Sequence, residues 1–144
     1  MTKPIGKKFN KKRMARKIVF SALYATKITE GSIDLSALQK KVTDGGDADF
    51  AYAKQLLEDY LENKDKIDAM IQECQTPSKR SENTDVEIAI LQMAVTEMLV
   101  TEISHKVAIN EAIEIAKEYG AEGGYKFINA VLDSISNKIQ GREV

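Results

Sequence analysis

Apolar residues recur at spacings of three and four positions along most of the chain, and alternating β-branched stretches are nearly absent. This period is typical of helices that bury one face, so the pattern predicts an all-α fold, a compact helical bundle. The chain has 144 residues, which suits one domain with a sizeable core. We expect seven helices, at residues 10–29, 34–43, 48–62, 64–75, 84–102, 106–119 and 123–139. They form a single domain over 10–144, preceded by a basic, disordered arm over 1–9.

Residues at the predicted helix ends support these boundaries. Asp47 or Asp49 is expected to cap the third helix, and Thr84 with Glu87 three residues later forms a capping box at the start of the fifth. Gly120 matches a left-handed stop after the sixth helix. The fifth helix is apolar over a wide surface, so we expect it to lie at the centre of the core.

Charge is distributed very unevenly along the chain. Residues 1–27 carry nine lysines and arginines and no acid, whereas 28–144 hold the other 12 basic residues and all 22 acids. A segment of charge +9 is therefore joined to a body of charge −10, although the net charge is only −1. Such asymmetry suggests a polyanionic partner for the basic end. The alternative is a solubilising tail that pairs with the acidic body.

The first helix has two faces when its residues are placed 100° apart. The side expected to pack into the body is small and apolar: Ala15, Ile18, Val19, Ala22 and Thr26. The other side is basic and also aromatic: Arg13, Arg16, Lys17, Phe20, Tyr24 and Lys27. Such a face suits RNA, because cations neutralise phosphates and rings stack on unpaired bases. Packing under a neighbouring helix is the expectation for Phe20, while both interpretations stay open for Tyr24.

The sequence favours neither an enzyme nor a metal or cofactor site. His105 is the only histidine and has no cluster of Cys or carboxylates with ligand spacing around it, so it is expected to start a helix. Asn110 or Glu111 is expected to brace neighbouring backbone rather than to do chemistry. Cys74 is the only cysteine, which agrees with a reducing cytoplasm. No apolar stretch approaches the length of a membrane span or a signal core, so we expect no membrane contact.

Four segments carry a resemblance to a known family. They are KRMAR at 12–16, SALY at 21–24, KVAINEAIEIAK at 106–117 and KFINAVLD at 126–133. Together, and in this order over nearly the whole chain, they resemble the NusB family of bacterial transcription antitermination factors. The match at 106–117 is the more specific of them.

The resemblance implies a compact seven-helix NusB-like fold and a role in transcription. The family binds single-stranded boxA RNA of nascent transcripts together with NusE, a small-subunit ribosomal protein. The complex helps RNA polymerase to read through terminators, chiefly in ribosomal RNA operons. Carried over by position, the RNA-binding residues are Lys12, Arg13, Arg16 and Tyr24 with Lys126, Phe127 and Asn129, and the helical projection adds Lys17. Glu87 matches an acidic position on the side that faces NusE.

The chain departs from the family pattern at several positions. Met14 stands where a third consecutive basic residue is frequent, and Gln92 and Thr96 replace a frequent Arg and Tyr. Gly123-Gly124 replaces polar residues, so the last helix is expected to start more loosely. The competing hypothesis is a protein-interaction module: a homodimer whose interface masks the first helix.

Overall fold

All secondary-structure elements in the described part of the chain are helices, joined by short turns. The computed structural model describes residues 4–29, 48–75 and 85–141, with side chains from residue 11 on. Its helices are α1 (Pro4–Thr29), α3 (Phe50–Glu62), α4 (Lys64–Cys74), α6 (Asp85–Val100), α7 (His105–Tyr119) and α8 (Gly124–Ile139). The all-α prediction is confirmed, and six of the seven expected helices are present. The expected helix at 34–43 lies outside the described residues.

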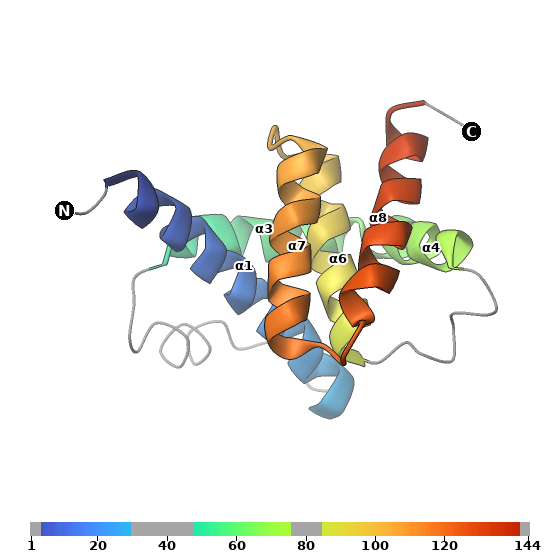
Figure 1. Ribbon diagram of the computed structural model, residues 1–144, viewed down its shortest axis with the longest axis horizontal. Coiled ribbons are helices and arrows are strands. Elements are labelled where there is room, and N and C mark those ends of the chain that lie inside the picture. The colour runs from blue at the N-terminus through green and yellow to red at the C-terminus, as the bar shows by residue number, and fades with distance from the viewer. Residues whose placement is uncertain (1–3, 30–47, 76–84, 142–144) are drawn as a thin grey trace.

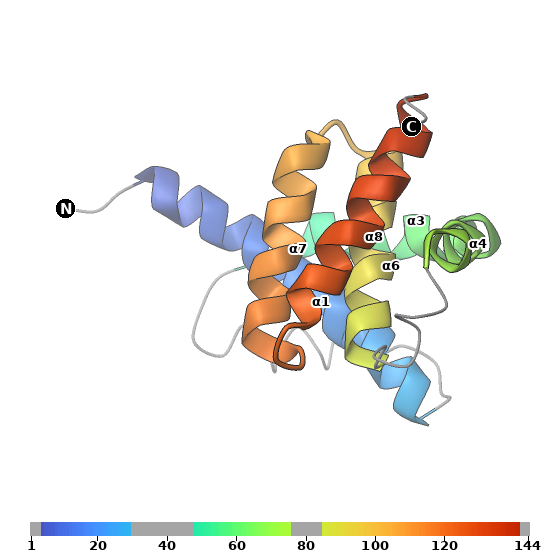
Figure 2. The same cartoon turned by 45° about the vertical axis from the view of Figure 1, so that its right-hand side comes forward.

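Helix α6 is the centre of the molecule (Figure 1). Its residues 89–98 are buried without a break, and it packs against all five other described helices. Helices α7 and α8 run side by side in opposite directions, and α1 crosses behind them (Figures 1 and 2). The prediction of a central fifth helix is therefore confirmed. Within the described ranges, no helix is long and apolar enough to cross a membrane.

The predicted inner face of α1 is confirmed for its four apolar residues, whereas Thr26 is only half-buried. Ala15, Ile18, Val19 and Ala22 are fully buried in the core. Phe20 is buried as well, as expected from the packing interpretation. Burial of these apolar side chains against α3 and α6 is what holds the helix on the body.

The observed helix starts agree with the predicted ones in part. Asp49 caps α3, because its carboxylate accepts a hydrogen bond from the backbone N–H of Tyr52 at 3.0 Å. Asp47 and Thr84 lie outside the described residues. Helix α1 begins at Pro4, before the expected start at residue 10, and proline suits a first helical turn because its φ is already fixed. The division into an arm over 1–9 and a domain over 10–144 stays a prediction.

The expected left-handed stop at Gly120 is wrong. Gly120 has φ −85° and ψ 175°, an extended conformation, and the left-handed residue of this turn is Gly123 with φ 82°. Gly120 is instead constrained by space, because a Cβ there would lie only 2.8 Å from the carbonyl oxygen of Ala116. The α7–α8 turn therefore requires glycine at 120 for lack of space and at 123 for its positive φ.

Candidate RNA interface

Arg16 does not lie on an exposed basic face. It is 2% exposed, and its Nε donates to both carboxylate oxygens of Glu97, at 3.0 and 2.9 Å. Its Nη1 donates to Oε1 of Glu111 at 3.3 Å. The expectation of a surface position for Arg16 is therefore wrong, since α6 and α7 cover this part of α1 and supply two carboxylates that compensate the buried charge.

The Glu97 carboxylate also accepts a hydrogen bond from the hydroxyl of Tyr52 on α3. Burial, followed by the nearby Glu97 charge, raises the pKa of Tyr52 well above its ordinary value, so the phenol keeps its proton and stays a donor. The polar cluster around Arg16 thus joins four helices: α1, α3, α6 and α7.

Arg13 lies at the edge of this cluster and remains partly accessible. Its Nε and Nη2 each donate to an oxygen of Glu111 at 2.9 Å, a bidentate pair, while its side chain is 39% exposed. The hydrogen bond to Arg13 holds the pKa of Glu111 below its ordinary value, and the same bond raises the pKa of Arg13. Glu111 therefore braces two arginine side chains, whereas the sequence suggested neighbouring backbone.

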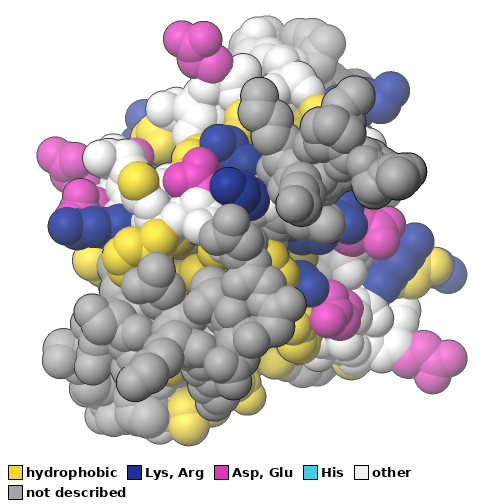
Figure 3. All heavy atoms as spheres, turned by 90° about the vertical axis from the view of Figure 1, so that its left-hand side faces the viewer, with side chains coloured by type: hydrophobic (Ala, Val, Ile, Leu, Met, Phe, Trp, Pro, Cys, Tyr) yellow, Lys and Arg dark blue, Asp and Glu magenta, His cyan; other side chains and the backbone are white. Residues whose placement is uncertain are grey.

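Two further cations of α1 are also paired. Lys12 contacts Asp49 at 3.3 Å and lies 4.4 Å from the centroid of the Tyr52 ring. Lys17 contacts Glu118 of α7 at 2.9 Å. On the face shown in Figure 3, several groups of Lys and Arg side chains lie directly beside acidic ones. An RNA phosphate would therefore have to compete with carboxylates for these cations.

Lys27 is half-buried rather than fully exposed on a basic face. Its Nζ donates to Oε1 of Gln92 at 2.6 Å, and Gln92 donates in turn to Asp68 at 3.0 Å. Burial lowers the pKa of Lys27. Gln92, one of the departures from the family pattern, thus links α1 to α4 through α6.

The aromatic candidates differ in accessibility. Tyr24 is half-buried and stacks on Phe20, with ring centroids 6.3 Å apart. Phe127 is 5% exposed and belongs to the core. Its ring is closed off from a nucleobase, so the expectation of an accessible Phe127 is wrong. The other candidates on α8, Lys126 and Asn129, are exposed.

Two tyrosines that were not proposed as RNA contacts lie beside lysines near the α7–α8 turn. Tyr119, the last residue of α7, is 46% exposed, and Nζ of Lys17 is 5.8 Å from its ring centroid. Nζ of Lys117 is 5.1 Å from the ring of Tyr125. The pair of Lys17 and Tyr119 has no local signal in the sequence, because its members are about a hundred residues apart and meet only when α1 packs on α7.

Glu87 lies inside the molecule and not on a partner-facing surface. It is fully buried, and its Oε2 accepts a hydrogen bond from the N–H of Ala121 at 3.1 Å. A Cβ on Gly124 would overlap the same carboxylate. The expectation that Glu87 faces NusE is therefore wrong in this structure, where the side chain braces the α7–α8 turn from within.

The only histidine and the only cysteine of the sequence both lie at helix ends. His105 is the first residue of α7, which confirms it as a helix-start residue, and its Nδ1 lies 2.6 Å from Oγ of Ser136. Cys74 ends α4 and is half-buried, and burial raises the pKa of its thiol.

The comparisons with known proteins cover most of the chain. The NusB family model matches residues 13–137. The transcription antitermination protein NusB of Pseudomonas entomophila (strain L48) is 34% identical over 137 residues, which cover 93% of this chain and 81% of the relative. That of Bacillus mycoides (strain KBAB4) is 37% identical over 130 residues, which cover 90% of this chain and 99% of the relative.

Solved structures share the fold. NusB of T. maritima superposes with a TM-score of 0.74 at 31% identity, over 88% of this chain and 90% of its own. A NusB chain from a structure of the antitermination factors NusB and NusE in complex with dsRNA gives a TM-score of 0.72, over 88% of this chain and 96% of its own. That second chain is 23% identical and shows the fold alone.

Proposed function

This chain belongs to the NusB family, and from that premise we propose that it is a non-catalytic, cytoplasmic RNA-binding factor of transcription antitermination. With NusE it binds single-stranded boxA RNA of nascent transcripts, chiefly of ribosomal RNA operons. The complex then helps RNA polymerase to read through terminators. Relatives named transcription antitermination proteins support this proposal, as does a fold shared with a NusB chain that was solved with NusE and dsRNA.

The observation that carries the proposal is the pair of lysine–tyrosine contacts near the α7–α8 turn. Lys17 lies beside the exposed ring of Tyr119, and Lys117 lies beside Tyr125. A cation next to a tyrosine ring offers an RNA chain one group for a phosphate and one for a base. Lys126, exposed in the first turn of α8, adds a cation to the same end of the molecule.

The cations of α1 then extend this surface. Lys12 and Arg13 are partly exposed beside their carboxylates, so each can exchange one anion for another without a change of fold. Tyr24 and Asn129 complete the proposed set, and both are accessible at least in part. Arg16 is assigned a positioning role, because it contacts the carboxylates that hold α1 and not solvent.

The test is a titration of single-stranded boxA-like RNA, with and without NusE, against the wild type and Tyr119→Ala. Loss of one stacked base should weaken binding about 5- to 150-fold, in line with roughly 1–3 kcal/mol per base. Tyr119→Phe keeps the ring and should bind RNA like the wild type. Lys64→Ala, which removes an exposed side chain from the first turn of α4, is the control for the loss of a surface side chain and should have no effect.

Equal RNA affinity for Tyr119→Ala and the wild type at two salt concentrations would contradict the proposed surface. The homodimer stays the competing hypothesis. Sedimentation over a concentration series would favour it if a tight dimer persisted in the presence of saturating RNA.

A further inference from the structure

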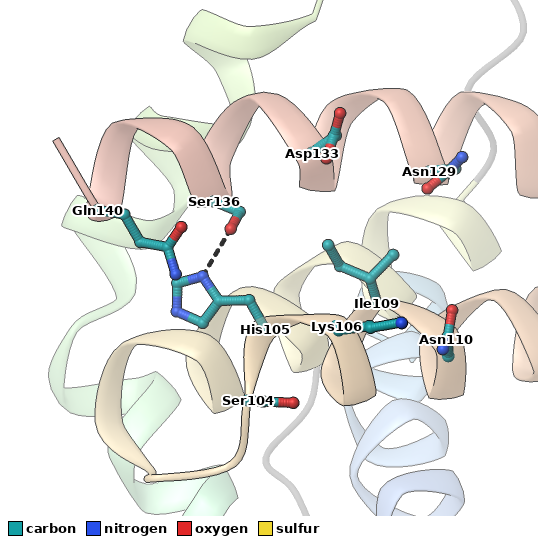
Figure 4. A pocket seen from close by; sticks show the side chains of 9 residues that line it. All are labelled: Ser104, His105, Lys106, Ile109, Asn110, Asn129, Asp133, Ser136 and Gln140. Atoms are coloured by element: carbon teal, nitrogen blue, oxygen red, sulfur yellow. Dashed lines mark hydrogen bonds between the residues drawn. The ribbon is translucent and has the colours of Figure 1, made fainter. Parts of the chain in front are cut away.

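A polar pocket lies between the first turns of α7 and the middle and end of α8, away from the lysine–tyrosine pairs. It has a volume of about 470 Å³, within the range of small-molecule sites. Lys106 and Asn110 line it from α7, and Asn129 and Asp133 line it from α8 (Figure 4). Asn129 also belongs to the predicted RNA-binding residues, so the pocket adjoins the proposed RNA surface.

Some polar side chains of this pocket are paired, since Nδ1 of His105 lies 2.6 Å from Oγ of Ser136, whereas four others are open to a ligand. Among the described residues, no hydrogen bond or ion pair involves the side chains of Lys106, Asn110, Asn129 or Asp133. This contrasts with four cations of α1, namely Lys12, Arg13, Arg16 and Lys17, each of which contacts a carboxylate. The pocket therefore offers donors and acceptors that a ligand can take up without breaking an internal contact.

The walls differ in charge, and an apolar side chain lies between them. The ammonium group of Lys106 comes from α7, the carboxylate of Asp133 from α8, and Ile109 projects into the space between the two helices (Figure 4). A flat ring could thus rest on Ile109 while its edges meet a donor on one side and an acceptor on the other. One cation and one carboxylate leave the pocket with no net charge, which does not favour a phosphate.

Guanine is the nucleobase whose edges fit these walls. Its N1–H and N2–H₂ form two adjacent donors for a carboxylate, while O6 and N7 are acceptors for a lysine. Adenine and cytosine place a ring acceptor beside their amino group, and uracil has carbonyls on both sides of its N–H. A carboxylate would face an acceptor in each of those bases, which costs affinity.

We propose that this pocket holds one unpaired guanine of the bound RNA, with Asp133 on its Watson–Crick edge and Lys106 on O6 and N7. The inference rests on the proposed function, because it needs a single-stranded RNA on the neighbouring surface. Unpaired bases that are turned out of a strand are the usual targets of sequence-specific RNA recognition.

The experiment uses the same boxA-like RNA with NusE present, and each guanine is replaced in turn by adenine or by inosine, which lacks N2. For the wild type, replacement of one particular guanine by adenine should weaken binding at least tenfold, and inosine at the same position should weaken it about fivefold. Asp133→Asn should bind the original RNA and the inosine-substituted RNA equally, because only the carboxylate distinguishes the 2-amino group. Glu114→Gln, which removes an exposed acid from α7, should keep the wild-type preference.

The outcomes separate the two proposals. If RNA binds but no guanine replacement distinguishes the wild type from Asp133→Asn, the pocket is wrongly assigned while the proposed function stands. If no RNA binds to any variant, both fail. If Asp133→Asn loses affinity for NusE and keeps its guanine preference, the pocket is a protein contact and the guanine assignment is overturned. Circular dichroism of each variant verifies that it is folded.

Discussion

Arg16 is the most deeply buried basic residue in the described part of the chain. Its guanidinium has two carboxylate partners, Glu97 and Glu111, and almost no exposure. We expect Arg16→Ala to lower the free energy of unfolding by about 3–5 kcal/mol, because removal of one side of a buried pair leaves uncompensated charge. Urea denaturation followed by circular dichroism measures this loss.

Arg13→Ala is the natural comparison, since it removes a neighbouring arginine from the same helix. Glu111 keeps Arg16 as a partner in this variant, and the Arg13 side chain is already partly solvated, so the loss of stability should be clearly smaller. Similar small losses for both variants would show that Arg16 is not buried as described. RNA binding should be weakened by Arg13→Ala without unfolding.

The sequence could predict which residues of α1 are basic but not what they contact. A helical projection grouped Arg16 with Arg13 and Lys17 because it treats the helix as covered on one side only. The acids that bury Arg16 lie 81 and 95 residues further along the chain, out of reach of any local pattern. Phe127 was misjudged for a related reason: the family motif marks a position, while burial depends on how α8 packs.

At the scale of elements, the α7–α8 turn depends on one carboxylate. We expect Gly124→Ala to lower the free energy of unfolding by about 1–3 kcal/mol, because the added methyl group overlaps the Glu87 carboxylate. Thermal and urea unfolding give the value. Since Tyr119 and Tyr125 flank this turn, RNA affinity should fall as well.

A double-mutant cycle tests the cause of that loss. In a Glu87→Ala background the carboxylate is gone, so Gly124→Ala should cost much less than it does in the wild type. Additive effects of the two substitutions would mean that the clash is not with Glu87. Gly123→Ala serves as a control of a different kind, since φ is positive there and no atom lies within 4 Å of the added group.

Helices were the most predictable elements, because an apolar period is a local property. The described helices from α3 onward begin and end within about two residues of the expected positions. The turn was less predictable: Gly120 and Gly123 look alike in sequence, yet one glycine is required by a close approach and the other by positive φ. The burial of Glu87 is likewise not visible in the sequence, since nothing local shows that a distant turn closes over it.

At the scale of the whole molecule, the sequence offers two interpretations of the charge asymmetry. The basic end binds a polyanion, or it pairs with the acidic body. The cations at 12–17 pair with carboxylates of α3, α6 and α7, so part of the positive charge attaches α1 to the acidic body. The partly exposed members of the same set remain accessible to an anion. The pairing with the acidic body is therefore confirmed, while the polyanionic partner stays a proposal. If RNA binds, its affinity should reflect a competition between phosphates and internal acids.

The pairing of Arg13 with Glu111 makes the free energy of unfolding depend on pH in the acid range. The hydrogen bond from Arg13 holds the pKa of Glu111 below its ordinary value of 4.5 in the folded state. A depressed carboxyl pKa stabilises the fold above the unfolded value, and this contribution is lost as pH falls through the folded pKa. We expect the free energy of unfolding to decline as pH drops below about 4.5, measured by urea denaturation between neutral and acid pH.

Glu111→Gln isolates the contribution of this carboxyl group to the acid dependence. The variant cannot titrate at this position, so it should be less stable than the wild type at neutral pH and should lose less stability on acidification. Glu114→Gln, on the same helix but exposed, should follow the wild-type curve closely. An unchanged acid dependence in Glu111→Gln would mean that other carboxylates control it and that the link between α1 and α7 contributes little.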